Sequence, residues 1–280
     1  SDIRKMMKND DIINNYIHDI GVDYMSSAAI GIGFAANMNM NHNEIFNIPY
    51  SGFHIGLGWG AKFENILKNM TVSNNFIHDH MHMGIFDGGG IYTNGNSSGN
   101  NIISENYIKN QGNHVALLYF DNGSTNWNAE YNVFDSSETP IDPYYNTELR
   151  WFQINNPAEN ILIKNNYSTS KSHGFVENGA INCSITDHTY VTDLNWSDEA
   201  RTIINNSGLQ DSYKVMRKNQ AERIVTNLPK TDIMAMNAGE AFSLSVKATD
   251  GKDIDVDMSN IKVVYEIADE DVATISNDGV

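Results

Sequence analysis

Residues 43–56 read NEIFNIPYSGFHIG, and both halves of this stretch recur along the chain. The first half is an asparagine followed by a variable residue and then a bulky apolar one. Its copies are Asn15-Tyr16-Ile17, Asn43-Glu44-Ile45, Asn75-Phe76-Ile77, Asn106-Tyr107-Ile108 and Asn132-Val133-Phe134, with a weaker copy at Asn166-Tyr167-Ser168. Successive asparagines are 28, 32, 31, 26 and 34 residues apart. Such a regular period is typical of repeat proteins, in which each unit stacks on the next.

The second half is a small residue followed by a short apolar strand. It recurs as Gly52-Phe53-His54-Ile55-Gly56, Gly90-Ile91-Tyr92-Thr93 and Ala116-Leu117-Leu118-Tyr119-Phe120. Two short strands per unit indicate one coil of a β-solenoid, because helical repeats would need apolar residues at helical spacing and a propeller blade is longer. We therefore predict an all-β fold, a right-handed parallel β-helix.

The recurrent asparagine has two readings. It either marks exposed turns or lies inside a turn of every coil. In stacked coils the second arrangement forms a ladder, because each side chain bonds along the axis and satisfies turn backbone. The same register in five copies favours the ladder.

Composition limits the classes of function. The chain has 280 residues, 40% of them hydrophobic, and a formal net charge of -17. So acidic a protein repels phosphate backbones, and we expect no nucleic acid partner. The sequence has no apolar stretch of the roughly 20 residues that a membrane span requires. A single cysteine, Cys183, excludes an internal disulfide and a cysteine-based zinc site.

The texture of the sequence changes toward the C-terminus. The repeat fades after Asn166, although Ile203-Ile204-Asn205-Asn206 reads as a related fragment. Residues 212–223 are charged and lack turn residues, which predicts a short helix or capping segment. Beyond Leu228-Pro229, period-two alternation over 241–248 predicts an antiparallel strand. Further apolar strands are expected at 263–267 and 271–275.

The residues Ala238-Gly239-Glu240 and 271–280 carry a resemblance to bacterial immunoglobulin-like (group 2) repeats. We assign 1–226 to a parallel β-helix domain and 227–280 to a partial bacterial immunoglobulin-like domain. A solenoid needs a polar cap at each end. Neither a cap before Asn14 nor the strands that would complete the second domain are seen. We therefore expect that both ends of this chain are truncated.

Polar and aromatic residues are densest at residues 78–94, where three histidines and two aspartates flank Gly88-Gly89-Gly90. In stacked coils this segment would lie between residues 52–60 and 119–124. Two aspartates in the resulting groove, Asp87 and Asp121, match the carboxylate pair of glycoside hydrolysis, in which one carboxyl protonates the leaving oxygen while the other attacks or activates water. Candidate sugar-binding side chains are His54, Trp59, His82, Tyr92 and Tyr119.

Each of these residues also has a simpler reading. An aspartate before glycine or Asn-Gly is common in turns that carry no chemistry. The cluster His78-Asp79-His80-Met81-His82 resembles a metal-ligand set, but a single strand sends alternate side chains to opposite faces and cannot close a site. We therefore expect no metal and no cofactor.

Three stretches together carry a family resemblance: 43–60, 87–93 and 118–124. They resemble the parallel β-helix proteins around glycoside hydrolase family 141, over residues 10–170. The resemblance implies a fucosidase or xylanase-like enzyme that acts on plant cell-wall or other complex polysaccharides. It assigns catalysis to the positions of Asp87 and Asp121. One departure is Asn122, where the family often has another acidic residue.

Two alternatives remain. The solenoid could be a non-catalytic carbohydrate-binding or adhesin module, which binds without turnover. It could also be a polysaccharide lyase, but a lyase needs a cation to neutralise the uronate carboxylate, and only Lys62 and Lys109 lie near the groove in sequence. Under each reading the partner is a polysaccharide or oligosaccharide. We expect a monomer that is secreted or displayed on a bacterial surface.

Overall fold

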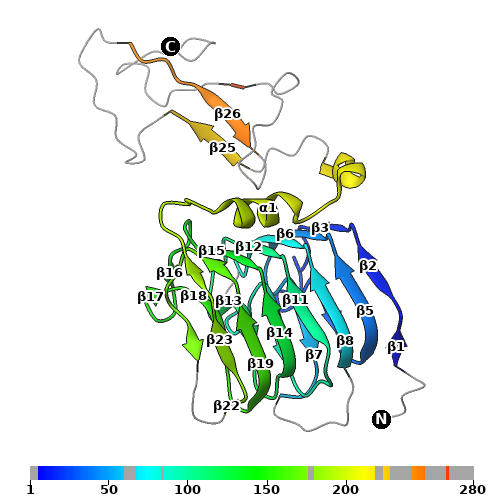
Figure 1. Ribbon diagram of the computed structural model, residues 1–280. Helices are drawn as coiled ribbons and strands as arrows, with labels where there is room; N and C mark the ends of the chain where they lie inside the picture. Colours follow the sequence, from blue (N-terminus) through cyan, green and yellow to red (C-terminus); the bar gives the residue numbers. More distant parts are fainter. Residues whose placement is uncertain are drawn as a thin grey trace. The chain divides into compact units, whose positions relative to one another are not determined.

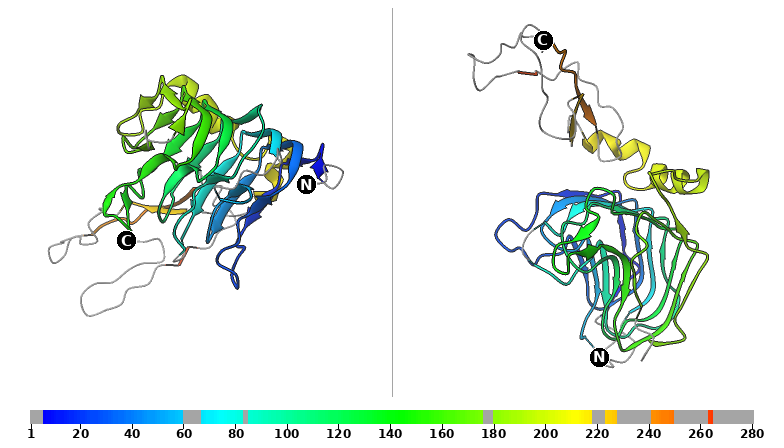
Figure 2. Two further views of the ribbon diagram at one scale, coloured as in Figure 1. Left: turned by 90° about the horizontal axis from the view of Figure 1, so that it is seen from below. Right: turned by 90° about the vertical axis from the view of Figure 1, so that its left-hand side faces the viewer.

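The computed structural model describes residues 6–59, 67–82, 85–175, 180–217, 223–227, 241–249 and 263–264 (Figure 1). The chain divides into two compact units, Ser1–Met216 and Arg217–Val280. Most of the regular structure in the first unit is β-strand (Figure 2). No helix in the described residues has the length and apolar character needed to cross a bilayer.

Three parallel sheets build the first unit. Sheet 1 contains, in spatial order, β1 (Met7–Lys8), β5 (Ala35–Asn41), β8 (Leu67–Ser73), β11 (Asn101–Ser104), β14 (Thr125–Glu130), β19 (Ala158–Lys164) and β22 (Ala180–Ile181), with β2 (Asp11–Ile13) and β23 (Ser184–Thr186) paired at its ends. Sheet 2 contains β24 (Thr189–Tyr190), β20 (Tyr167–Ser168), β15 (Val133–Asp135), β12 (Tyr107–Lys109), β9 (Phe76–His80), β6 (Glu44–Ile48) and β3 (Tyr16–His18). Sheet 3 contains β21 (Gly174–Phe175), β18 (Arg150–Ile154), β13 (Ala116–Phe120), β10 (Ile91–Asn94), β7 (Phe53–Gly56) and β4 (Ile30–Ile32).

The chain visits the three sheets in turn, and we call each such pass a coil. Neighbouring strands in a sheet therefore come from successive coils, and the colours of Figure 1 run in order across each sheet. The predicted all-β class and parallel pairing are confirmed, and the arrangement is consistent with a parallel β-helix. Inside the stack, Phe53, Ile91, Leu118 and Phe152 lie in register and are fully buried. Each of these four coils therefore contributes one apolar side chain to a continuous hydrophobic core.

The repeated asparagines form the expected ladder. The side-chain amide of Asn43 donates to Oδ1 of Asn75 at 2.9 Å, and the same bond links Asn75 to Asn106 and Asn106 to Asn132 at 2.9 Å. The next step, from Asn132 to Asn166, is 3.0 Å. Each Oδ1 also accepts the backbone N–H of the preceding rung. The ladder thus satisfies turn backbone within the stack.

A second asparagine column lies on the surface and was not predicted. Asn37 donates to Asn9 at 2.8 Å and Asn69 donates to Asn37 at 2.7 Å. These residues have positive φ, between 53° and 59°. Asparagine tolerates this left-handed backbone better than most residues because its short side chain bonds locally. The high asparagine content therefore has two separate structural causes.

Helix α1 (Asp198–Asn206) covers the outer face of sheet 2. Ser197 caps its first turn by accepting the N–H of Ala200, and Asp198 and Glu199 follow in that turn. Its apolar side packs with the outward residues of the sheet and the segment before the helix; this cluster comprises Phe76, Tyr107, Val133, Tyr167, Val191, Trp196, Ala200 and Ile203. The reading of residues 203–206 as a repeat fragment is wrong, because that stretch is helical.

The chain then returns along the stack as a strap, residues 196–210. Ser207 donates to the carbonyl of Glu105, Gly208 donates to that of Asn74, and Asn14 donates to Gln210 at 2.8 Å. The strap therefore reaches from a late coil back to the first one. It is followed by the 3-10 helix η2 (Asp211–Arg217), which overlaps the helical segment predicted at 212–223.

The second unit is described only in part. Strand β25 (Arg223–Thr226) pairs antiparallel with β26 (Val246–Thr249), which overlaps the strand predicted at 241–248. The strand predicted at 271–275 lies outside the described residues, as does most of the one predicted at 263–267. The division between units falls at 216/217, ten residues before the predicted boundary. The immunoglobulin-like assignment stays a prediction.

Gly56→Ala is expected to destabilise the first unit by about 3 kcal/mol, because the change brings both a strained backbone conformation and a steric clash. Gly56 has a φ of 120°, and an added Cβ would lie 1.8 Å from the carbonyl oxygen of Asn94. Gly31→Ala in the same sheet is the control, since a Cβ there meets nothing within 4 Å. Denaturant unfolding of both variants measures the difference. Equal midpoints would contradict the close packing of these coils.

Candidate functional site

The outer face of sheet 3 carries an aromatic column. Parallel register places His54 beside Tyr92, and Tyr92 beside Tyr119. The ring centroids are 4.7 Å apart in the first pair and 5.1 Å apart in the second. Stacking of coils thus gathers side chains that are far apart in sequence, as the repeat predicts.

Two carboxylates meet at this column. Tyr119 Oη lies 2.9 Å from Oδ1 of Asp87 and 3.0 Å from Oδ1 of Asp121. These carboxylate oxygens cannot be more than 5.9 Å apart, the sum of the two distances. Tyr92 donates to the other oxygen of Asp121 at 2.7 Å, and Asn155 donates to Oδ1 at 3.0 Å. Both carboxylates are therefore held by side chains of other coils.

The two carboxylates differ in exposure. Asp121 is 3% exposed, whereas Asp87 is exposed and has a φ of 74°. Burial and the negative charge of Asp121 raise the pKa of Tyr119 far above its ordinary value, and burial raises that of Tyr92. Both phenols therefore stay protonated at neutral pH and act as hydrogen-bond donors.

Trp59 and His54 flank the pair. Trp59 is 57% exposed, and its indole N–H donates to the hydroxyl of Tyr92 at 2.5 Å. Burial lowers the pKa of His54, so its ring is neutral at neutral pH, and its Nε2 lies 2.9 Å from the amide nitrogen of Asn94. These groups extend the polar and aromatic surface from Asp121 toward the earlier coils.

His82 lies apart from this network. Its side chain is exposed, and its Nδ1 lies beside Gly112, where an added Cβ would be 2.9 Å away. The other histidines of the segment are engaged locally: His78 Nδ1 bonds Asp79 at 2.7 Å and His80 bonds Gln111 at 3.0 Å. Among the described residues, no group of three or more histidine, cysteine or acidic side chains could hold a metal ion.

The triple glycine serves packing between coils. An added Cβ at Gly89 would lie 2.3 Å from the carbonyl oxygen of Ala116, and one at Gly90 would lie 2.5 Å from Ile108. Neither glycine has positive φ, and both are buried. Close approach of neighbouring coils therefore accounts for these two glycines. Asn122, at the departure from the family pattern, donates to the carbonyl of Asn156.

A cavity of about 520 Å³ opens beside the carboxylates. Asp87, Tyr119 and Asn155 line it, together with Arg150. The expectation that Lys62 and Lys109 are the only cations near the groove is wrong. Arg150 pairs with Ala116 in the register of β18 and β13. Because Arg150 lies far from the other groove residues in sequence, its place in the cavity was not recognised. The 34-residue spacing between these two residues equals that between Asn132 and Asn166, and this was the clue that could have found it.

A hairpin formed by β16 (Ile141–Asp142) and β17 (Thr147–Glu148) supplies the outer wall of this cavity. Tyr145, in the turn between the two strands, lines the cavity, and its ring lies edge-on to His114 at 4.8 Å. His114 bonds the buried carboxylate of Asp142 at the base of the hairpin. The hairpin interrupts the repeat between β15 and β18, so the period gave no means of predicting it.

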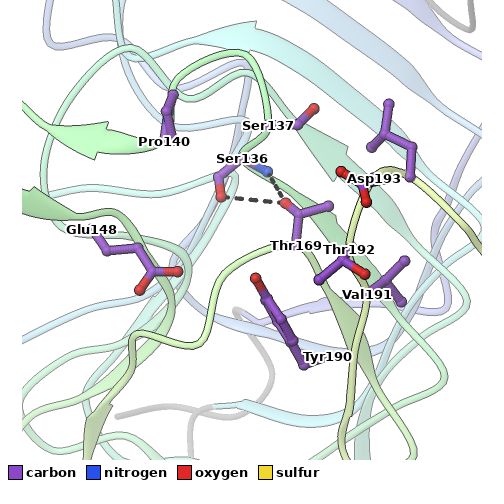
Figure 3. Close-up of a pocket in the computed structure, with 10 residues that line it drawn as sticks. Ser136, Ser137, Pro140, Glu148, Thr169, Tyr190, Val191, Thr192 and Asp193 are labelled. Carbon is purple, nitrogen blue, oxygen red and sulfur yellow. Dashed lines mark hydrogen bonds between the residues drawn. The ribbon is translucent and has the colours of Figure 1, made fainter.

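A second cavity, of about 280 Å³, lies between β15, β20 and residues 190–194 (Figure 3). Glu148 and Tyr190 line it, and Thr169 accepts the backbone N–H of Ser136 at its edge. None of the carboxylate or aromatic residues predicted from the sequence lines this cavity. It therefore has no part in the carboxylate site.

Comparison with known proteins supplies a likeness in fold. No protein-family model matches the chain, and no curated protein matches it significantly. One solved structure, a glycoside hydrolase, is similar. Its TM-score is 0.52 at 20% sequence identity, and the match covers 77% of this chain. The chain spans only 30% of that structure's length. At this identity the likeness concerns the fold alone.

Proposed function

We propose that this protein hydrolyses glycosidic bonds in a complex polysaccharide of plant cell-wall or host origin, using Asp87 and Asp121 as a carboxylate pair. The observation that carries the proposal is the bridging of both carboxylates by one hydroxyl, that of Tyr119. The solved structure that is similar in fold is a glycoside hydrolase, so the fold is compatible with this proposal.

The exposed member of the pair, Asp87, is assigned to proton transfer at the glycosidic oxygen. It lines the cavity, whereas Asp121 is buried behind it and accepts hydrogen bonds from Tyr92 and Asn155. These donors hold Asp121 in a fixed position, which suits the carboxylate that stabilises a positive, oxocarbenium-like transition state. Tyr119 has a single hydroxyl proton, so it donates to one carboxylate at a time.

The stereochemical course follows from spacing. The nearest oxygens of the pair are at most 5.9 Å apart. Retaining enzymes place their carboxyl groups about 5 to 5.5 Å apart, and inverting ones about 6.5 to 9.5 Å. We assign retention, the course whose carboxyl spacing this bound fits best, in which a covalent glycosyl intermediate forms and water later releases the sugar. Proton NMR of the first anomer formed tests this, and an inverted product would contradict it.

The finer assignments belong to the same proposal. The first unit is taken as a right-handed parallel β-helix of the kind around glycoside hydrolase family 141, with fucosidase or xylanase-like specificity. Residues 227–280 are taken as part of a bacterial immunoglobulin-like domain. The protein acts outside the cell or on a bacterial surface as a monomer, and its acidity excludes nucleic acid as a ligand.

Tyr119→Phe is expected to lower kcat by about 100-fold, since it removes the hydroxyl that links the two carboxylates. The ring and its packing remain, so the unfolding midpoint should fall only by the loss of one buried hydroxyl, as in the control below. Initial rates on xylan and on 4-nitrophenyl glycosides, read beside a denaturant titration, measure both quantities. Tyr107→Phe, which removes a buried hydroxyl that bonds Asp135 in sheet 2, is the matched control. Equal rates for the two variants would refute the bridging role.

A polysaccharide lyase is the second candidate, and Arg150 favours it. A guanidinium in the cavity supplies the cation that a lyase needs for the uronate carboxylate. A lyase leaves an unsaturated sugar that absorbs ultraviolet light, whereas a hydrolase releases only reducing ends. Measurement of both signals on polygalacturonic acid separates the two reactions. Binding with neither product identifies a carbohydrate-binding module.

A further inference from the structure

Arg150 is an unusual group in this molecule. The chain has 35 acidic residues against 18 lysines and arginines, and Lys109, Lys164 and Lys214 each form an ion pair with a carboxylate. Arg150 donates to the side-chain oxygen of Gln153 at 2.8 Å and lies 5.9 Å from the ring centre of Tyr145. In the described part of the chain, no carboxylate lies within ion-pair distance of it. The guanidinium thus keeps most of its donors for a ligand.

A chain of hydrogen bonds fixes this guanidinium relative to the carboxylates. Gln153 accepts from Arg150 and donates to Oδ1 of Asn155 at 2.7 Å. Asn155 in turn donates to Asp121 at 3.0 Å and to Tyr119 at 2.6 Å. Each amide has its oxygen toward the arginine and its nitrogen toward the carboxylate. The relay therefore holds a positive group at a set place in the cavity that contains Asp87.

Gly174 makes room for this relay. It pairs with Gln153 across sheet 3, and an added Cβ would lie 1.5 Å from Oε1 of Gln153. The oxygen at risk is the one that accepts from Arg150. Any side chain at position 174 would push Gln153 away, so the glycine is needed for the arrangement around the arginine.

Aromatic rings complete the wall of the cavity. Tyr145 is 54% exposed and packs against Arg150, and Tyr144 and Phe86 continue the surface at 58% and 46% exposure. The ring centroids of Phe86 and Tyr144 are 5.2 Å apart. Exposed rings beside a polar cavity suit the apolar face of a pyranose. The combination of an unpaired guanidinium and stacking rings fits a sugar that carries a negative charge.

We infer that the cavity beside Asp87 is a subsite for an anionic sugar residue, bound through Arg150 and stacked on Tyr145. The anion is a carboxylate of a uronic acid or a sulfate ester, both of which accept paired hydrogen bonds from guanidinium. This inference deepens the proposed function, because it names the substrate class of the same site. Binding itself does not depend on turnover.

The test is calorimetric titration of the full chain carrying Asp87→Asn, which removes turnover. The probes are trigalacturonic acid, a sulfated carrageenan disaccharide and neutral xylotriose. One anionic probe should bind at least about 10-fold more tightly than xylotriose, because bonds to a charged group are worth more than neutral ones. The probe that binds identifies the anion as carboxylate or sulfate.

Adding Arg150→Gln to the chain that carries Asp87→Asn should weaken binding of that probe by about 10- to 100-fold. The affinity for xylotriose should stay unchanged. Lys164→Gln removes the same charge from an exposed side chain of β19 in sheet 1 and should have no effect, which separates a local contact from net charge. Gly174→Ala keeps the arginine but displaces Gln153, and should weaken the anionic probe by several-fold. It serves as the test if Arg150→Gln does not fold.

Equal affinity for all three probes, or unchanged affinity in the Arg150→Gln and Gly174→Ala variants, overturns the inference. The proposed function fails separately. Release of reducing ends by the wild-type chain from xylan without any anionic preference retains the hydrolase and removes the anionic subsite. Arginine-dependent binding of trigalacturonic acid without any product retains the subsite and removes the hydrolase.

Discussion

Asp121→Asn is expected to lower kcat/KM by about 10³-fold or more, a loss of about 4 kcal/mol of transition-state stabilisation. Asparagine has nearly the same shape, although its single amide oxygen replaces two acceptors, Oδ2 for Tyr92 and Oδ1 for Tyr119. It has no negative charge with which to attack or stabilise a cationic sugar. Reducing-end release from the best polysaccharide substrate, measured over a range of concentrations, gives kcat and KM separately.

Asp135→Asn is the matched control for this variant. Asp135 is also 3% exposed and also accepts from a tyrosine hydroxyl, that of Tyr107 at 3.2 Å, but it lies in sheet 2. Its replacement should leave kcat/KM unchanged. If both variants lost activity equally, the loss would reflect general damage to a buried carboxylate. If neither did, Asp121 would have no part in catalysis.

Asn106→Ala is expected to destabilise the first unit by about 3 to 5 kcal/mol. The Asn106 side chain accepts from the backbone and amide nitrogens of Asn75, and it donates to Val72 and Asn132. Alanine leaves these buried groups without their partner, and each orphaned group costs about 1 to 3 kcal/mol. Urea unfolding followed by circular dichroism measures the change.

Asn128→Ala provides the comparison. Asn128 lies on the exposed side of β14, and a surface substitution of this kind changes stability by at most about 0.5 kcal/mol. A loss of similar size in both variants would mean that asparagine acts only through backbone propensity. A large loss confined to Asn106→Ala would instead locate the stabilisation in the buried ladder.

The features that recur in each coil could be predicted from the sequence, whereas the features that interrupt the repeat were missed. Asn43, Asn75 and Asn106 recur with similar neighbours, so the ladder and the parallel stacking followed from spacing alone. Stacking in register then brought Tyr92, Tyr119 and Asp121 together. The site residues whose place is set by the repeat could therefore be named from the sequence.

The remaining features leave little or no periodic trace. Arg150 is placed by the register of β18 with β13, and only its 34-residue spacing from Ala116 pointed to that position. Helix α1 was missed because Ile203 and Asn205 imitate the repeat, although Ser197 followed by Asp198 is a capping pattern. His82 was grouped with the site because sequence proximity to Asp87 does not reveal which way a loop turns.

The strap has a mechanical consequence. It carries the chain from the later coils back along the stack, so that Gln210 contacts Asn14 across 196 positions of sequence. Tension applied through the residues after Arg217 therefore enters the unit beside its first coil. The load must shear the bonds of Ser207 and Gly208 before it can reach the last strands. A protein tethered by its C-terminal side therefore cannot unwind from its last coil until the strap has detached.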